Sequence, residues 1–197
     1  MHRRAAATLL IGSLMFVAAA FFPISQEVFG NLDDPSAMAA SIAGGRAAWI
    51  TATVVFGVGA LVAAAGMWTL ARQLEHTAIS AIGYIGGVAA VVAAVVYAYV
   101  ASLRVIDTPE EVAAALNGSD WTLLVGSLTA QIALIAIGYL LIRSSRHWLG
   151  WMLVVVGVGT MTGYVALGDM PPGVYYAAWL IAAITLLVSR RTPVDTA

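Results

Sequence analysis

Few polar side chains with the potential for chemistry lie within the long apolar stretches of this chain. Gln131 lies midway along one such stretch, and Ser127 precedes it by one helical turn. Thr160 and Thr162 are the polar points of the next stretch. Uncharged amides and hydroxyls in such settings hydrogen-bond a neighbouring helix or contact a lipid or small apolar ligand. These four residues are our candidate polar core or ligand contacts, and we favour hydrogen bonding between helices.

Ionisable residues do not fall in the middle of any apolar stretch. His2, His76 and His147 lie at segment ends beside arginines, so we expect them at the membrane surface rather than on a metal or haem. The chain has no cysteine, and no Ser/His/Asp set can be assembled at one depth. We therefore expect no catalytic, metal or cofactor site, and no proton-driven activity, because proton relays need titratable groups inside the membrane.

Six apolar stretches must position these residues. A bilayer core is crossed by a helix of about 20 apolar residues. Hydrophobic residues make up 61% of the chain and charged residues 10%, against about 25% charged in soluble domains. We predict an all-α membrane protein, a six-transmembrane-helix bundle forming one integral membrane domain over residues 1–197. We expect the first stretch to be retained as a span, the alternative being a cleaved secretory signal peptide. The predicted spans are 5–22, 47–70, 78–103, 121–142, 148–168 and 174–189.

Arginines predict the orientation of these spans, because basic residues are retained on the cytoplasmic side. One set of flanks holds only Arg46 and Arg104 together with most of the acidic residues. The opposite set of flanks holds the other arginines of the chain: Arg3, Arg4, Arg72, Arg143, Arg146, Arg190 and Arg191. Both termini are therefore expected to be cytoplasmic. The net charge of −1 leaves no basic surface for nucleic acid.

Two outer loops carry the signals of short amphipathic helices. Asp34–Pro35 supplies an N-cap and a first helical residue, and Gly44–Gly45 ends the turn. Thr108–Pro109 and Asn117–Gly118 supply the same signals in the second loop. The two helices either lie at the interface and cap the bundle, or form a lid over an outward-facing crevice. Their small apolar faces are expected to consist of Met38 and Ile42 in the first helix and of Val112 and Leu116 in the second.

Aromatic residues gather at the predicted segment ends. Trp121, Trp148 and Trp151 stand near the starts of two spans, and Tyr175 and Tyr176 near the start of the last. Trp and Tyr are enriched at both membrane surfaces. We therefore expect all five side chains in an interfacial aromatic belt.

A short internal echo suggests an alternative architecture. Residues 8–14 (Thr-Leu-Leu-Ile-Gly-Ser-Leu) recur as residues 122–128 (Thr-Leu-Leu-Val-Gly-Ser-Leu) in a span that runs the opposite way. A true duplication would be an inverted 3+3 repeat, as in many transporters. Ion coupling through backbone carbonyls would then need an unwound helix, for which residues 157–163 are the one candidate stretch.

Two segments resemble a known family. Residues 33–42 (Asp-Asp-Pro-Ser-Ala-Met-Ala-Ala-Ser-Ile) are similar to an outer loop of Asp–Ala–Thr–Ala–Asn–Ile type. Residues 138–144 (Gly-Tyr-Leu-Leu-Ile-Arg-Ser) with Trp148–Gly150 are similar to the same family's junction between helices four and five. The chain thus resembles the bacterial six-helix membrane protein family catalogued as domain of unknown function 4386. The resemblance implies a multi-pass protein of the bacterial cytoplasmic (inner) membrane, and implies no activity or functional residues.

These observations favour a non-enzymatic integral membrane protein that engages membrane lipids or a membrane partner. The expected partners are lipids, a second copy of the chain or another membrane protein. The alternative is a small secondary carrier for a neutral or cationic solute built on the inverted 3+3 repeat. Unbroken helices would favour the first function, and helices broken at mid-depth would favour the carrier.

Overall fold

The computed structural model describes residues 2–74, 80–117, 121–144, 146–167 and 172–188. Every regular element in these ranges is an α-helix, which confirms the all-α prediction. The predicted span limits at residues 78, 168 and 189, the stop at Gly118, and His76 lie outside the described residues. The helices are α1 (His2–Ala20), α2 (Pro23–Gly30), α3 (Pro35–Gly44), α4 (Arg46–Leu74), α5 (Ser80–Ile106), α6 (Pro109–Asn117), α7 (Trp121–Arg143), α8 (His147–Leu167) and α9 (Gly173–Val188).

Long apolar helices build the body of the molecule. Within the described ranges, α1, α4, α5 and α7 are long and apolar enough to cross a membrane. Helix α8 has 21 residues, and α9 is an apolar helix of 16 residues. Helix α8 is continuous through residues 157–163, the stretch considered for unwinding. The chain is therefore a membrane protein on the strength of at least four helices.

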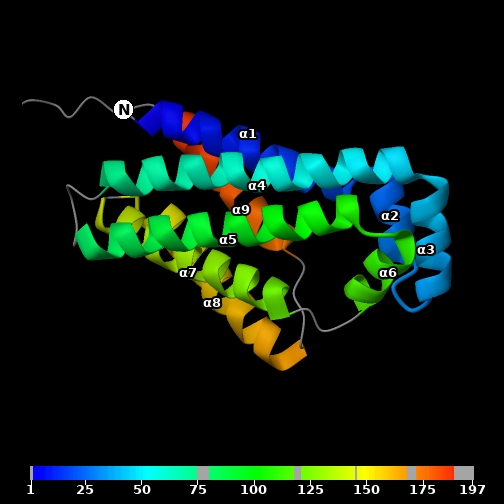
Figure 1. The fold of residues 1–197 in the computed structure, drawn as a ribbon. Helices are drawn as coiled ribbons and strands as arrows, with labels where there is room; N and C mark the ends of the chain where they lie inside the picture. The colour runs from blue at the N-terminus through cyan, green and yellow to red at the C-terminus, as the bar shows by residue number, and fades with distance from the viewer. Residues whose placement is uncertain (1, 75–79, 118–120, 145, 168–171, 189–197) are drawn as a thin grey trace, which may run out of the picture.

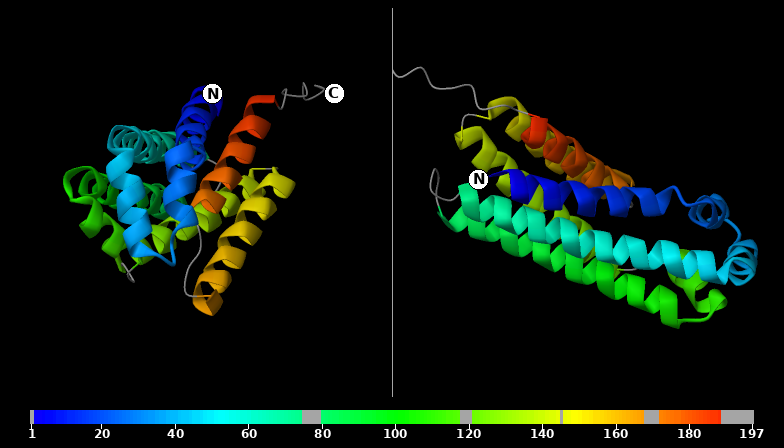
Figure 2. Two further views of the ribbon diagram at one scale, coloured as in Figure 1. Left: turned by 90° about the vertical axis from the view of Figure 1, so that its right-hand side faces the viewer. Right: turned by 90° about the horizontal axis from the view of Figure 1, so that it is seen from above.

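The long helices pack as a bundle in which neighbours in space are mostly neighbours in sequence. Helix α1 lies between α9 and α4, and the series continues from α4 to α5, α7 and α8. Helices α8 and α9 make only a small contact. Helix α1 begins and α9 ends toward the same end of the bundle, and the short helices α2, α3 and α6 lie at the opposite end (Figures 1 and 2). We call these three short helices the cap.

Glycines allow the closest helix crossings in the bundle. A Cβ atom on Gly66 of α4 would lie 2.5 Å from the backbone nitrogen of Leu9 in α1. A Cβ atom on Gly138 of α7 would lie 2.8 Å from the carbonyl oxygen of Gly150 in α8. Backbones this close gain van der Waals contact, which drives helix association in lipid where no hydrophobic effect is available.

Predicted capping residues start two helices of the cap. The Asp34 carboxylate accepts hydrogen bonds from the backbone nitrogens of Ser36 and Ala37, at 3.0 and 3.1 Å. Thr108 and Glu111 form a reciprocal capping box, in which the Thr108 backbone nitrogen donates to Glu111 Oε2 at 2.9 Å. A hydrogen bond from the Ser36 hydroxyl lowers the pKa of Asp34, and the bond from the Thr108 backbone lowers the pKa of Glu111. The predicted starts of α3 and α6 are confirmed.

Helix α2 was not predicted, so the two expected short helices become three. Its first residue is Pro23, and its N-cap residue Phe22 makes no side-chain capping bond. The Ser25 hydroxyl instead donates to the Ala19 carbonyl at 2.8 Å, and the Gln26 amide donates to the Ala20 carbonyl. These side chains satisfy carbonyls at the end of α1, where the chain passes into α2.

The cap has an apolar cluster of its own, separate from the core of the bundle. Met38 and Ile42 of α3 and Val112 of α6 are buried there, as predicted, together with Trp49 of α4. Arg46 at the start of α4 donates from Nη2 to the carbonyls of Val105 and Asp107, each at 2.7 Å. A cation at these carbonyls stabilises the C-terminal end of α5. These bonds join the start of α4 to the end of α5 beside the cap.

Candidate functional site

The polar residues predicted on α7 meet tyrosines inside the bundle. Gln131 is fully buried, and its Nε2 donates to the hydroxyl of Tyr175 in α9 at 3.1 Å. The Ser127 hydroxyl lies 3.4 Å from the hydroxyl of Tyr97 in α5, and either oxygen is a donor for that bond. The expectation that Gln131 faces the bundle and bonds a neighbouring helix is confirmed. These bonds join α7 to α5 and α9.

Stacked aromatic rings fill the space beside these bonds. Phe16 of α1 stacks on Tyr176 of α9 with ring centroids 3.6 Å apart. Phe56 of α4 and Tyr97 of α5 contact Phe16 with centroid distances of 4.3 and 5.6 Å. Four helices thus contribute one ring each to a packed group, which we call the aromatic centre. At this level side chains fill the middle of the bundle.

The predicted aromatic belt is wrong for two of its five members. Tyr175 and Tyr176 are buried in the bundle, because α9 begins beside the aromatic centre rather than at the end of the molecule. Trp121, Trp148 and Trp151 are more than half exposed at the starts of α7 and α8. Proximity to a predicted span end therefore placed the tryptophans on the surface correctly and misplaced the tyrosines.

The two candidate threonines of α8 do not join this polar group. Thr160 is buried, and its hydroxyl donates to the Val156 carbonyl of its own helix at 2.7 Å. Thr162 is exposed, and its hydroxyl donates to the Val158 carbonyl at 3.0 Å. Such bonds satisfy a hydroxyl within one helix. Of the four candidates, the structure brings only Ser127 and Gln131 into contacts between helices.

Three buried side-chain polar atoms have no hydrogen-bond partner among the described residues. One is Nε1 of Trp49, in the apolar cluster of the cap, and the other two, in the bundle, are Oε1 of Gln131 and Oγ of Ser13 in α1. A buried acceptor without a donor is costly in a membrane interior, since lipid tails offer no hydrogen bond. These two atoms are the places in the bundle where a polar molecule would find a partner.

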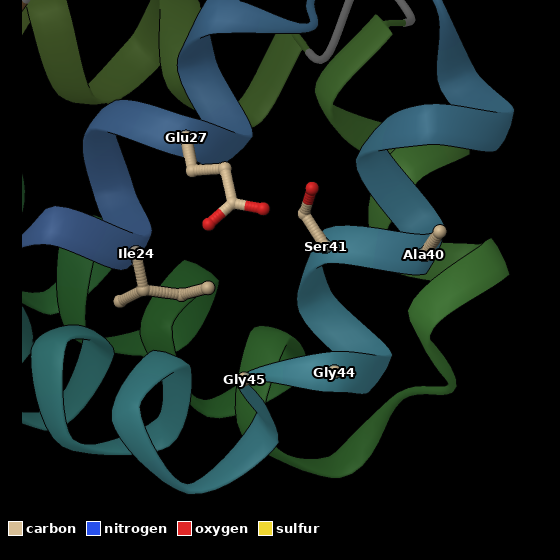
Figure 3. A pocket seen from close by; sticks show the side chains of 6 residues that line it. All are labelled: Ile24, Glu27, Ala40, Ser41, Gly44 and Gly45. Atoms are coloured by element: carbon tan, nitrogen blue, oxygen red, sulfur yellow. The ribbon is translucent and has the colours of Figure 1, made fainter.

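The cap contains an open hollow that sequence reasoning did not find. Its volume is about 390 Å³, and it lies between α2 and α3. Figure 3 shows the side chains of Glu27 and Ser41 projecting into it from the two facing helices. We call it the cap pocket, and it is lined by Ile24, Glu27, Ala40, Ser41, Gly44 and Gly45.

Glu27 supplies the only formal charge in the lining of the cap pocket. No ion pair to this carboxylate occurs within the described residues, and the two arginines of the cap end are oriented elsewhere. Arg46 binds carbonyls at the end of α5, and the Arg104 guanidinium lies 5.7 Å from the Phe56 ring centroid. The pocket thus presents a negative charge without a counter-ion, which suits a cationic group.

The last turn of α3 forms the other side of the pocket. Ser41, Gly44 and Gly45 line it there, and the carbonyls of Ser41 and Gly45 accept hydrogen bonds from the backbone nitrogens of Gly45 and Trp49. Helix α4 begins at Arg46, so the dipoles of α3 and α4 oppose each other at this point and Glu27 is left as the source of the negative charge. No atom lies within 4 Å of the position that a Cβ on Gly44 would occupy, so this position is open.

A second, much smaller hollow lies where α6 covers the ends of α5 and α7. Its volume is about 40 Å³, and Arg104, Asp107 and Leu116 are among its lining residues. This space accommodates little more than a water molecule. Helix α6 packs chiefly on α3, and only this small space separates it from the ends of α5 and α7.

Metal ligation finds no support in the described part of the chain. No group of three or more His, Asp or Glu residues there is placed to hold a metal ion. Comparisons with protein-family models, curated protein sequences and solved structures found no match to this chain. The function therefore has to be argued from the bundle and the cap themselves.

Proposed function

We propose that this chain is a six-span protein of the bacterial cytoplasmic membrane, with both termini in the cytoplasm and the cap outside. The length and composition of α1, α4, α5 and α7 support the proposal, as does the packing of α8 on α7 and of α9 on α1. The arginine distribution supports the orientation, because Arg46 and Arg104 are the only ones among the described arginines that lie near the cap. Membership of the family of domain of unknown function 4386 is part of the same proposal.

Within this arrangement the chain acts as a non-enzymatic protein that engages membrane lipid. The observation that carries the proposal is the contrast between a packed aromatic centre and an open, charged cap pocket. The centre is filled by rings with centroids as close as 3.6 Å, whereas the pocket holds about 390 Å³ beside an uncompensated carboxylate. Binding therefore takes place at the surface of the bundle, at the level where lipid headgroups lie.

Lipid retention tests this function directly. The protein is reconstituted into nanodiscs with an equimolar mixture of zwitterionic and anionic lipids, released into the gas phase and analysed by native mass spectrometry. We expect retained lipids to differ in composition from the bulk mixture, because specific contacts outlast the general lipid shell. Retention in the same proportions as the bulk mixture would contradict the proposal.

A carrier for a neutral or cationic solute is the second candidate, and one observation favours it. Gln131 Oε1 and Ser13 Oγ are buried polar atoms without partners among the described residues, as expected at a solute site. Proteoliposomes containing a pH-sensitive dye and supplied with radiolabelled ethanolamine or glycerol separate the two functions. Our proposal predicts no uptake and no acidification above empty liposomes. Uptake that is lost in Gln131→Leu would favour the carrier.

A further inference from the structure

The cap pocket combines the groups that a primary ammonium requires. An ammonium carries three N–H donors and no acceptor, so its site must supply several acceptors and a negative charge. The Glu27 carboxylate provides the charge and two oxygens, and the Ser41 hydroxyl oxygen faces it from α3 (Figure 3).

Apolar side chains around α2 indicate that the ammonium belongs to a lipid. Phe21, just before α2, is 72% exposed, and Phe29 and Leu32 are exposed at its far end. The three side chains flank the element that carries Glu27, at the cap end of helices long enough to cross a membrane. Exposed aromatic residues in this position lie at the level of lipid headgroups. A soluble amine would derive no benefit from them.

The lining of the pocket disfavours lipids with a net negative charge. Its single charged residue, Glu27, is itself an anion. No arginine lines the pocket to bind a phosphate. An anionic headgroup would therefore be repelled, whereas a zwitterionic headgroup places its ammonium against Glu27 and leaves its phosphate in water.

We propose that the cap pocket binds the ammonium group of an ethanolamine-type zwitterionic lipid, with Glu27 as counter-ion and Ser41 as a hydrogen-bond acceptor. This inference rests on the proposed lipid-binding function and specifies its site and its ligand class. Choline-type lipids have the same charge, but their quaternary nitrogen has no N–H to donate. The pocket therefore selects ethanolamine over choline headgroups, and both over anionic headgroups.

The test uses nanodiscs with equal amounts of phosphatidylethanolamine, phosphatidylcholine and phosphatidylglycerol, read by native mass spectrometry. For the wild-type protein we expect phosphatidylethanolamine to be enriched over each of the other two lipids. Glu27→Gln keeps the shape of the side chain and removes its charge, so enrichment should fall about fivefold, the equivalent of one partly exposed ion pair. Asp33→Asn removes the same charge outside the pocket lining and should leave the enrichment unchanged.

A second variant tests the cavity rather than the charge. Gly44 lines the pocket and its Cβ position has no atom within 4 Å, so Gly44→Leu adds bulk at the edge of the pocket without a clash. It should reduce phosphatidylethanolamine enrichment with Glu27 intact. Helix content and melting temperature of both variants, compared with the wild type, exclude misfolding as the cause of a loss.

The remaining outcomes separate this inference from the proposed function. Enrichment that survives both Glu27→Gln and Gly44→Leu would overturn the pocket assignment and leave lipid binding itself standing. Retention in bulk proportions by the wild type would overturn both. A final arm titrates ethanolamine hydrochloride into nanodiscs that lack phosphatidylethanolamine. Binding of this soluble amine that depends on Glu27 would show that the ligand is not a lipid.

Discussion

The aromatic centre and the cap pocket use polar side chains in opposite ways. Beside the aromatic centre, Gln131 and Ser127 are buried and bond to Tyr175 and Tyr97, so their polar groups connect helices. In the cap pocket, Glu27 is exposed beside a hollow and has no ion pair among the described residues. The first region is closed and the second is open to a ligand.

The difference follows from the surroundings of each region. A polar group surrounded by lipid must find its partner within the protein, because lipid tails supply none. A polar group at the headgroup level has water as an alternative partner and can exchange it for a ligand. We therefore expect substitutions in the bundle to change stability, and substitutions in the cap pocket to change binding.

The largest effect on stability is expected where glycine allows two helices to touch. In Gly66→Ala the new methyl group meets the backbone of Leu9, which cannot move without shifting α1. Overpacking of this kind costs about 1–3 kcal/mol. Gly44→Ala is the matched control, because its methyl group meets open space in the cap pocket. Circular dichroism in detergent should show a lower melting temperature for the first variant only. Equal melting temperatures would mean that the α1–α4 crossing is looser than the structure has it.

A smaller loss is expected for the hydrogen bond between α7 and α9. Gln131→Leu removes the bond to Tyr175, and bonds of this kind contribute about 0.6 kcal/mol on average and at most about 1.7. Thr162→Val serves as the control, because Thr162 is exposed and bonds only its own helix. Equilibrium unfolding in mixed micelles measures both. A loss well above 2 kcal/mol for Gln131→Leu would mean that Gln131 does more than join two helices.

Titration of the cap offers a third contrast. The lowered pKa values of Asp34 and Glu111 mean that both carboxylates stabilise the cap when ionised. Their contribution is fully present above the ordinary values of 3.8 and 4.5, and is lost as the pH falls through the lowered values. Hydrogen exchange, corrected for intrinsic rates, should show α3 and α6 losing protection at acidic pH while α4 keeps it.

The matched variant for this titration is Asp34→Asn. Asparagine caps a helix about as well as aspartate and does not titrate. In this variant the acid-induced loss of protection should disappear from α3 and persist in α6. If protection from hydrogen exchange in α3 and α6 did not change between neutral pH and about pH 3, this would contradict the role given to the Asp34 and Glu111 carboxylates.

The smallest effect on stability is expected in the cap pocket itself. Glu27→Gln and Asp33→Asn replace exposed side chains, and such changes stay within about 0.5 kcal/mol. Thermal unfolding should not distinguish either variant from the wild type. A clear destabilisation by Glu27→Gln alone would mean that Glu27 has a structural partner, and the pocket would then lose its free charge.

Local signals account for the features that were predicted from sequence. The starts of α3 and α6 depend on Asp34 and Thr108, whose side chains act within three residues of their own position. The burial of Gln131 followed from a single rule, since an amide at mid-depth in lipid would lack a partner. Apolar length and composition were enough to predict the long helices.

Features that depend on distant contacts were missed. Helix α2 is anchored by Ser25 and Gln26 to the end of α1, although Pro23 at a first helical position was a signal that the sequence contained. The burial of Tyr175 depends on where α9 begins relative to α7, which no local pattern encodes. The cap pocket forms because α2, which carries Glu27, faces α3 across the hollow.

The most direct test of the contrast between a closed centre and an open cap is cysteine accessibility in intact cells. The chain has no native cysteine, so Ser41→Cys, Ser127→Cys and Ser144→Cys each give one reactive thiol. These positions report on the cap pocket, the aromatic centre and the end of α7 away from the cap. A membrane-impermeant maleimide should label Ser41→Cys from outside and Ser144→Cys only after permeabilisation, and should not label Ser127→Cys in either state. Labelling of Ser127→Cys from outside would reveal a water path into the bundle, and labelling of Ser144→Cys from outside would reverse the orientation; either result would contradict the account.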